Sequence, residues 1–179
     1  MILVGDKTIL RPLSWEDVPA FLQWCRDPEL QDLSNGTYPT SLAECGPWYS
    51  SLRANRQHKH FAIIARDGRF IGDIELDSIS WRRGEAELRI CIGDPAYRNR
   101  GLGTDAVATL VSYAFFRLHL RLVYLRVYRD NRRAIRCYEK VGFRTVGWLR
   151  RAGKLGEREI YLMALTPEDL RAPVRALAG

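Results

Sequence analysis

A short basic segment rich in glycine is the part of the sequence most suited to binding an anion: Arg98, Asn99, Arg100, Gly101, Leu102, Gly103 and Thr104. Glycines let the backbone approach a ligand closely, and successive N–H groups at the start of a helix point toward a bound anion. Arg98 and Arg100 add positive charge in the same place. The segment therefore predicts a pyrophosphate-binding loop, with an ordinary glycine-rich turn and two solvated arginines as the plain alternative.

The same glycines satisfy part of a dinucleotide-binding fingerprint, Gly101-x-Gly103-x-x-Ala106, and Asp130 ends a later expected strand. That interpretation is disfavoured because a loop over 93–100 separates the glycines from the preceding strand. Three antiparallel strands are expected before the motif, and too little chain follows Asp130 for a second Rossmann half. A P-loop is excluded because the sequence has no Gly-Lys-Ser/Thr triplet.

A second pattern, NxxAIxxYEKxGF at 131–143, follows the first, RxxGxG at 98–103, after one expected helix and one expected strand. The pair resembles the two coenzyme A motifs of the GNAT superfamily of N-acetyltransferases. The segments LRPLxxED at 10–17 and GxxR at 147–150 resemble the branch of ribosomal-protein N-terminal acetyltransferases, whose pattern polyamine acetyltransferases largely share. The resemblance covers about residues 3–165.

This resemblance implies an α/β (α+β) GNAT fold, with a mixed, mostly antiparallel sheet of about six to seven strands and about four flanking helices. Strands 85–92 and 121–128 would start parallel and then splay apart. Backbone groups left open there would pair with the pantetheine of acetyl-CoA. The implied cofactor contacts are the pyrophosphate loop 98–104 and, along the pantetheine arm, Ile90, Cys91, Ile92 and Asn131.

Acetyl transfer to an amine needs a neutral amine, a polarised thioester carbonyl and a proton for the leaving thiolate. Tyr138 is uncharged at neutral pH and can donate a proton, and the resemblance gives it the role of acid. Its place on an apolar helix face also fits a core tyrosine. Glu87 matches the catalytic glutamate of histone-acetylating members and is the expected base, with a salt bridge to Arg89 as the alternative. Other N-terminal acetyltransferases carry a glutamate where this chain has Arg126.

Direct transfer is expected, because no histidine is positioned by sequence to activate Cys91 or Cys137. The resemblance places the acceptor pocket in residues 24–50 and the closing strands. A protein N-terminal α-amine is the favoured acceptor, with a polyamine, an aminoglycoside or an amino sugar as alternatives. Acids and aromatic rings that suit a cationic amine, or an ordinary helical surface, are Trp24, Asp27, Glu29, Asp32, Tyr38, Glu44, Trp48 and Tyr49.

Hydrophobic periodicity indicates the elements that must hold these residues in place. Strands are expected over 3–10, 60–66, 69–79, 85–92, 121–128, 143–150 and 157–165. Helices are expected over 15–26 with Ser14 as N-cap, over 41–54 with an interruption at Gly46-Pro47, over 106–118 and over 131–141. No repeat or linker divides the chain, so residues 1–166 are expected to form one N-acetyltransferase domain and 167–179 a flexible tail.

The composition sets the remaining limits. The chain has 179 residues, 46% of them hydrophobic, which favours one globular domain. No apolar run suits a membrane span, and the N-terminus does not resemble a signal peptide, so a cytoplasmic location is expected. A net charge of +7 favours anionic partners. A basic nucleic-acid-binding module and a catalytically dead acyl-CoA sensor are the competing hypotheses, and nucleic acid is not the expected partner.

The cysteines and histidines predict no metal site. The four cysteines have no C-x-x-C spacing, and no two histidines sit at ligand spacing on a helix. Acetyl-CoA as co-substrate, which the resemblance implies, is the one cofactor expected, and the resemblance gives an amine as the other partner. A homodimer is compatible with the sequence but is not indicated by any motif.

Overall fold

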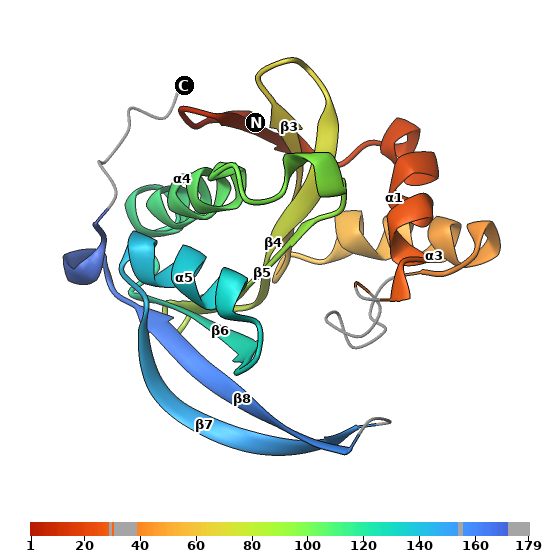
Figure 1. Cartoon of the computed structure of the whole chain (residues 1–179). Helices are drawn as coiled ribbons and strands as arrows, with labels where there is room; N and C mark the ends of the chain where they lie inside the picture. Colours follow the sequence, from red (N-terminus) through yellow and green to blue (C-terminus); the bar gives the residue numbers. More distant parts are fainter. Residues whose placement is uncertain (29, 31–38, 154–155, 172–179) are drawn as a thin grey trace.

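The computed structural model of the chain describes residues 1–28, 30, 39–153 and 156–171, which fold around one mixed sheet (Figure 1). Within these residues the strand order is β1-β2-β3-β4-β5-β6-β8-β7, and β5 with β6 is the one parallel pair. The mixed, mostly antiparallel α/β architecture is therefore confirmed. The strands are Leu3–Val4 (β1), Thr8–Pro12 (β2), Lys59–Ala65 (β3), Phe70–Ser80 (β4), Glu85–Ile92 (β5), Leu122–Tyr128 (β6), Arg144–Gly153 (β7) and Gly156–Leu165 (β8).

The N-terminal segment contributes one strand more than the sequence predicts. Instead of one strand over 3–10, it forms the antiparallel hairpin β1–β2, so the described sheet has eight strands instead of six to seven. The cause is a buried carboxylate on the first turn of helix α4. Asp105 accepts hydrogen bonds from the N–H groups of Asp6, Lys7 and Thr8 and from the Thr8 hydroxyl, at 2.7 to 3.0 Å. These bonds hold the hairpin turn against the start of α4.

Four α-helices in the described residues cover the two faces of the sheet, as Figure 1 shows. Helices α4 and α5 lie on one face, and α1 and α3 lie on the other. The main core fills the space under α4 and α5, where Val107, Leu110 and Val111 are fully buried. The bounds are Val18–Cys25 (α1), Leu42–Ala54 (α3), Leu102–Phe116 (α4) and Arg132–Val141 (α5).

Strict alternation along the middle strands gives the sheet one apolar and one polar face. On β5, Leu88 is buried in the main core, as the sequence predicts. The side chains that alternate with core residues on β4, β5 and β6 form a polar array, which lies on the side of α1 and α3: Asp73, Glu75, Asp77, Glu87, Arg89 and Arg126. This array borders the region where the middle strands part.

Helix α3 runs without a break through Pro47, so the interruption predicted at Gly46-Pro47 is wrong. The Ser41 hydroxyl caps the helix by accepting a hydrogen bond from the N–H of Glu44, at 3.4 Å. Trp48 stacks on Phe21 of α1, with ring centroids 4.8 Å apart. Capping and packing thus hold the helix together although proline removes one backbone donor.

Residues 167–171, which the sequence assigns to the tail, contact the domain. Pro167–Asp169 form a 3₁₀ turn, the Arg171 N–H donates to the Val141 carbonyl at 2.9 Å, and Asp169 accepts from Arg144 at 2.5 Å. The rest of the expected tail, 172–179, lies outside the described residues.

No helix among the described residues is both long enough and apolar enough to cross a membrane.

Candidate active site

The two middle strands start side by side and then separate. Strand β5 pairs with β6 at Glu85–Leu122, Ala86–Val123 and Glu87–Tyr124, and the pairing ends there. Strand β5 runs on beside β4 to Ile92, and β6 runs on beside β8 to Tyr128. Within the described residues, the β5 edge from 88 to 92 therefore faces no strand on the β6 side. This confirms the predicted splay and leaves backbone polar groups that need partners.

Ile90, Cys91 and Ile92, the predicted pantetheine contacts, lie on this open edge, and the glycine loop lies against them. A Cβ atom added to Gly103 would lie 3.8 Å from Ile92 Cγ1, 4.0 Å from Ile90 Cδ1 and 3.9 Å from Cys137 Sγ. The loop, the strand edge and helix α5 thus meet at one glycine. The two sequence motifs come together at the point where β5 and β6 part.

The glycine loop turns into α4 through two residues with left-handed backbone. Asn99 has φ +60°, and Gly101, the N-cap of α4, has φ +79°. Leu102 is the first helical residue and is buried. The Thr104 hydroxyl donates to Cys137 Sγ at 3.4 Å. The loop therefore delivers the N-terminus of a fifteen-residue helix to the strand edge, the arrangement that favours a bound anion.

The two arginines of the loop have different surroundings. Arg98 is turned inward, with its side chain 10% exposed, and donates to the carbonyls of Ile92 and Gly93 at 2.9 and 3.1 Å. It thereby fixes the end of β5. Arg100 is exposed, and its guanidinium lies over the ring of Tyr97, 5.1 Å from the centroid. Arg100 is the loop arginine that is placed at the surface, whereas Arg98 supports the backbone.

Helix α5 carries the predicted acid. The Asn131 side chain caps this helix by accepting from the Ala134 N–H at 3.2 Å. Tyr138 is buried, with its ring beside that of Phe143. Burial raises the pKa of the Tyr138 phenol strongly, and the nearby thiols of Cys137 and Cys91 add to the effect. The phenol therefore stays protonated across the physiological range and keeps the proton that a general acid would donate.

Among the described side chains, the thiols show no nucleophilic activation. Cys45, Cys91 and Cys137 are not disulfide-bonded. Burial raises the pKa of Cys137, an effect that the hydrogen bond from Thr104 only partly offsets. A protonated thiol is a poor nucleophile.

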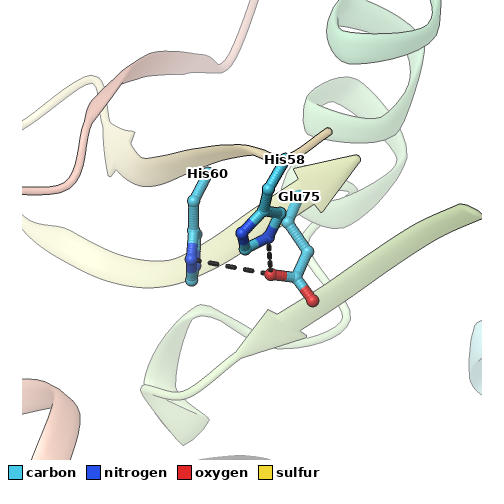
Figure 2. Close-up of side chains that lie close together, drawn as sticks. All are labelled: His58, His60 and Glu75. Atoms are coloured by element: carbon cyan, nitrogen blue, oxygen red, sulfur yellow. Dashed lines mark hydrogen bonds and ion pairs between the residues drawn. The ribbon is translucent and has the colours of Figure 1, made fainter. Parts of the chain in front are cut away.

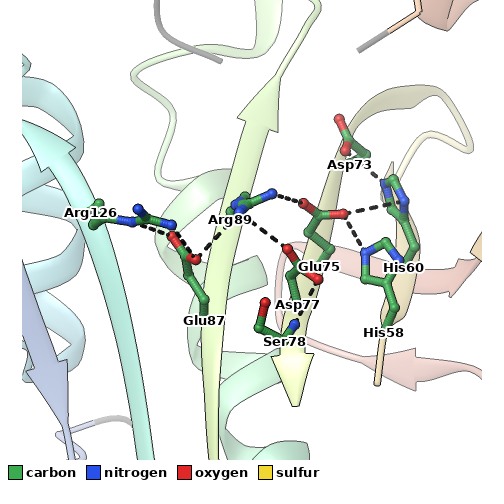
Figure 3. Close-up of polar contacts among 9 residues, drawn as sticks. All are labelled: His58, His60, Asp73, Glu75, Asp77, Ser78, Glu87, Arg89 and Arg126. Carbon is green, nitrogen blue, oxygen red and sulfur yellow. Dashed lines mark hydrogen bonds and ion pairs between the residues drawn. The ribbon is translucent and has the colours of Figure 1, made fainter. Parts of the chain in front are cut away.

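Glu87 lies at the vertex between β5 and β6 and is held by arginines from both strands (Figure 3). Arg126 of β6 donates from Nε to Oε1 at 2.9 Å and from Nη2 to Oε2 at 2.7 Å. Arg89 donates to Oε2 at 3.3 Å and also lies 3.2 Å from Asp77 and 3.6 Å from Glu75. In the sequence Arg126 stands out only as a departure from related enzymes, and its pairing with Glu87 is not predicted.

The polar array continues into β3 through two histidines that the sequence analysis did not single out (Figure 3). His58 lies 2.6 Å from Glu75, and His60 lies 2.8 Å from Asp73. Burial lowers the pKa of His60, but the hydrogen bond and charge of Asp73 outweigh it, so the pKa is raised overall. The signal in the sequence was His-x-His, which places both rings on one side of a strand.

The described aromatic residues expected near the acceptor are half-buried and pack against other rings or the backbone. Trp24 lies on Phe70, with centroids 4.8 Å apart, and the Tyr49 hydroxyl donates to the Leu13 carbonyl at 3.2 Å. Trp48 meets His60 edge-on. Three other residues of this set lie outside the described residues: Glu29, Asp32 and Tyr38.

Comparisons with known proteins agree with this geometry. The family model for the acetyltransferase (GNAT) domain matches residues 7–144. Spermidine N(1)-acetyltransferase of Escherichia coli K12 is 30% identical over 140 residues, which are 78% of this chain and 74% of that protein. Human alpha/beta-tubulin-N-acetyltransferase 9 is 27% identical over 160 residues, 81% of this chain and 76% of that protein.

Two solved structures share the fold. Spermidine N-acetyltransferase from Vibrio cholerae, in complex with CoA and spermine, superposes with a TM-score of 0.84 at 21% identity, covering 92% of this chain and 98% of that one. RimJ of Mycobacterium smegmatis, in complex with CoA-disulfide, gives 0.82 at 21% identity, covering 97% and 88%. With the family model matching most of its length and its middle strands parted beside the glycine loop, the chain belongs to the GNAT family and is an N-acetyltransferase.

Proposed function

We propose that this enzyme transfers an acetyl group directly from acetyl-CoA to the α-amine of a protein N-terminus. The observation that carries the proposal is the separation of β5 and β6 beyond Glu87, beside the loop at Gly101 and Gly103. In this arrangement the open edge at 90–92 pairs with the pantetheine amides, and the N-terminus of α4 binds the pyrophosphate. The exposed Arg100 adds charge to the phosphate contact, and Asn131 contacts the pantetheine arm.

The chemistry needs few groups. Tyr138 protonates the departing thiolate, and a backbone N–H near Cys91 polarises the thioester carbonyl. The raised pKa of the Cys137 thiol supports transfer without an acetyl-enzyme. Because Arg126 engages both oxygens of Glu87, the contacts favour a positioning role for this residue at the vertex. General base, the role expected from the sequence, is the alternative that the Glu87→Gln variant tests.

The pairing of charges favours an N-terminal α-amine over a polyamine. Each carboxylate of the polar array already has a hydrogen-bond or ion-pair partner within 4 Å: Arg126 at Glu87, Arg89 at Asp77 and Glu75, and the His60 ring at Asp73. A polyamine carries several positive charges and needs unpaired acids. An α-amine carries one, and with a pKa of about 8 it is partly neutral at pH 7 without a strong base.

A polyamine is the second candidate acceptor, and it is supported by the comparisons. The E. coli relative and the V. cholerae structure are both spermidine acetyltransferases. The acids of the array would then need to release Arg89 and Arg126 when substrate binds. Aminoglycosides and amino sugars are further alternative acceptors, and no specific contact in the structure favours either of them.

A thiol-release assay tests the proposal. The full chain is given acetyl-CoA with, in parallel, an N-terminally free peptide, the same peptide with a blocked N-terminus, spermidine, an aminoglycoside and an amino sugar. We expect release of CoA with the free peptide and not with the blocked one. Release with spermidine alone would replace the proposed acceptor with a polyamine.

The same assay separates the enzyme from its two competitors. A dead acyl-CoA sensor would be stabilised thermally by acetyl-CoA but release no thiol with any amine. A basic nucleic-acid-binding module would show no stabilisation by acetyl-CoA and a strongly salt-dependent affinity for nucleic acid. Either result would contradict acetyl transfer as the activity.

We further propose that the enzyme acts in the cytoplasm, where acetyl-CoA is available.

We also propose that the enzyme forms a homodimer through the edge strand β7. Val146 and Trp148 on this strand are 61% and 62% exposed, and Leu149 is 42% exposed. An exposed apolar edge strand invites pairing with a second copy. The related V. cholerae enzyme has a dodecameric structure. Mass photometry of the wild type and of Trp148→Lys would check this, since a monomeric wild type would exclude the dimer.

A further inference from the structure

Three side chains on the α3 side of β3 and β4 form a compact group of metal-ligand type: His58, His60 and Glu75 (Figure 2). His60 and Glu75 face each other directly across the β3–β4 ladder. His58 precedes His60 by two residues, so both rings lie on one side of the chain. The three side chains are 9%, 4% and 10% exposed, so they are almost completely shielded from water.

The tautomer of His60 follows from its second carboxylate neighbour. His60 Nε2 lies 2.8 Å from Asp73 Oδ2. An ionised carboxylate can only accept, so Nε2 carries the hydrogen and donates. The other ring nitrogen, Nδ1, is buried and has no hydrogen-bond partner. It faces Glu75 Oε2 at 3.6 Å.

This arrangement calls for a positive centre between Nδ1 and the carboxylate. In the neutral ring Nδ1 presents a lone pair to an anionic oxygen, which is repulsive unless a proton on Nδ1 or a metal ion lies between them. A separation of 3.6 Å is too long for a hydrogen bond. It is close to the distance of about 3.3 Å between two ligand atoms of a tetrahedral zinc ion with bonds of about 2.0 Å.

The third donor is already at the same oxygen. His58 Nε2 lies 2.6 Å from Glu75 Oε2 and donates to it when no ion is bound, so metal binding takes the His58 tautomer that carries its hydrogen on Nδ1. The three ligand atoms lie within 4.8 Å of one another. A side-chain shift of less than about 1 Å would lengthen the distance between His58 Nε2 and Glu75 Oε2 to that between two ligand atoms of one zinc ion. Arg89 approaches the other carboxylate oxygen, Oε1, at 3.6 Å, so it does not compete for Oε2.

We propose that His58 Nε2, His60 Nδ1 and Glu75 Oε2 bind a divalent first-row transition metal ion, with zinc as the best match. Two imidazoles and one carboxylate are a common protein ligand set for zinc. Asp73 holds the His60 ring from outside, the usual partner of a metal-bound histidine. The site is distinct from the coenzyme A machinery, and its existence does not depend on the identity of the acceptor. It also departs from the sequence expectation of no metal.

The test is a titration of the chelator-treated full chain with ZnCl₂, followed by calorimetry and by thermal denaturation. We expect one ion per chain and a higher Tm, because the ion binds the folded state. His58→Gln and Glu75→Gln should weaken binding at least tenfold, and Asp73→Asn about 10- to 100-fold. His119→Asn is the matched control: it removes the one histidine outside the group, at an exposed position with φ +56° that asparagine tolerates.

Two results would overturn the site. Zinc affinity that is unchanged in His58→Gln and Glu75→Gln would assign the ion to the thiols or the surface. The second result is a nitrogen NMR spectrum of the wild type in which both ring nitrogens of His60 are protonated and their chemical shifts do not change with zinc. A proton would then occupy the place proposed for the ion, between Nδ1 and Glu75. His58 lies just before β3, and the His58→Gln variant keeps a hydrogen-bonding side chain. Circular dichroism of this variant would verify that it folds.

Discussion

Both carboxylate oxygens of Glu87 accept hydrogen bonds from one guanidinium, that of Arg126, across the vertex where β5 and β6 part. The last backbone pair of the two strands is Glu87 with Tyr124, and Arg126 lies two residues farther along β6. The side-chain contact of Glu87 with Arg126 thus links β5 and β6 just beyond their last backbone pair. The pair joins the two strands at the point where the edge of β5 opens.

This relationship predicts how Glu87→Gln behaves. A positioning residue that keeps its shape should lose about tenfold or less in kcat/KM, because one acceptor oxygen for Arg126 remains. A general base should lose about 10²- to 10⁴-fold. We expect the smaller loss and an unchanged pH profile of kcat, and Arg126→Gln should have a similar effect. A large loss in Glu87→Gln, with the basic limb of the profile altered, would establish Glu87 as the base.

Tyr138→Phe is predicted to lower kcat at least about 10²-fold while leaving the affinity for acetyl-CoA unchanged, because only the proton donor is removed. Steady-state thiol release and calorimetric titration with CoA measure the two quantities. Tyr113→Phe is the control, since it removes the hydroxyl of a buried tyrosine on a different helix, α4. Wild-type turnover in Tyr138→Phe would remove Tyr138 from the mechanism.

Alanine substitutions at the two loop glycines are predicted to have different effects, one on stability and the other on CoA affinity. Gly101 has φ +79°, where an L-residue is strained, so Gly101→Ala should lower the free energy of unfolding by about 1–2 kcal/mol. Gly103 is helical, and an added Cβ would meet only ordinary contacts of 3.8 to 4.0 Å. Gly103→Ala should therefore fold as stably as wild type yet bind CoA at least about tenfold more weakly, because its methyl group lies against the open edge of β5.

Urea unfolding and CoA titration of both variants distinguish these effects. Full CoA affinity in Gly103→Ala would mean that the cofactor does not approach the loop at this residue. A wild-type stability for Gly101→Ala would mean that the loop adopts another conformation.

Much of this site could be predicted from the sequence because its parts are local. A glycine loop that opens an amphipathic helix, and a capped helix that ends at Gly142, are set by residues close together in the chain. The splay of β5 and β6 came from the family resemblance and is confirmed by the ladder. The inward turn of Arg98 could not be predicted, since it depends on carbonyls at the end of β5.

The polar array was missed because its contacts join strands that are distant in sequence. Glu87 and Arg126 meet only through the register of the parallel pair β5–β6. His60 meets Glu75 through the antiparallel register of β3 with β4. A search for histidines at helical spacing cannot find ligands that alternate along a strand, where the relevant interval is two residues.

The last prediction concerns pH and the first turn of the N-terminal helical segment. Asp17 is buried, and burial raises its pKa, but the hydrogen bonds from Arg11 and Ser14 outweigh that effect and lower the pKa overall. Arg11 donates to both Asp17 oxygens, at 2.7 and 2.6 Å. A carboxyl whose pKa is depressed by folding stabilises the protein at pH values above the pKa that it has in the unfolded chain, about 3.9. This stabilisation is lost as pH falls through the lower folded pKa.

Urea unfolding of the wild type and of Asp17→Asn checks the sign of this effect. At pH 7 the variant should be less stable by about 1–2 kcal/mol, because the ion pair with a partly exposed arginine is gone. The difference should shrink as pH falls below about 4, where the wild-type carboxyl also becomes neutral. A difference that stays constant down to the lowest pH at which the protein folds would show that Asp17 contributes through its shape and hydrogen bonds and not through its charge.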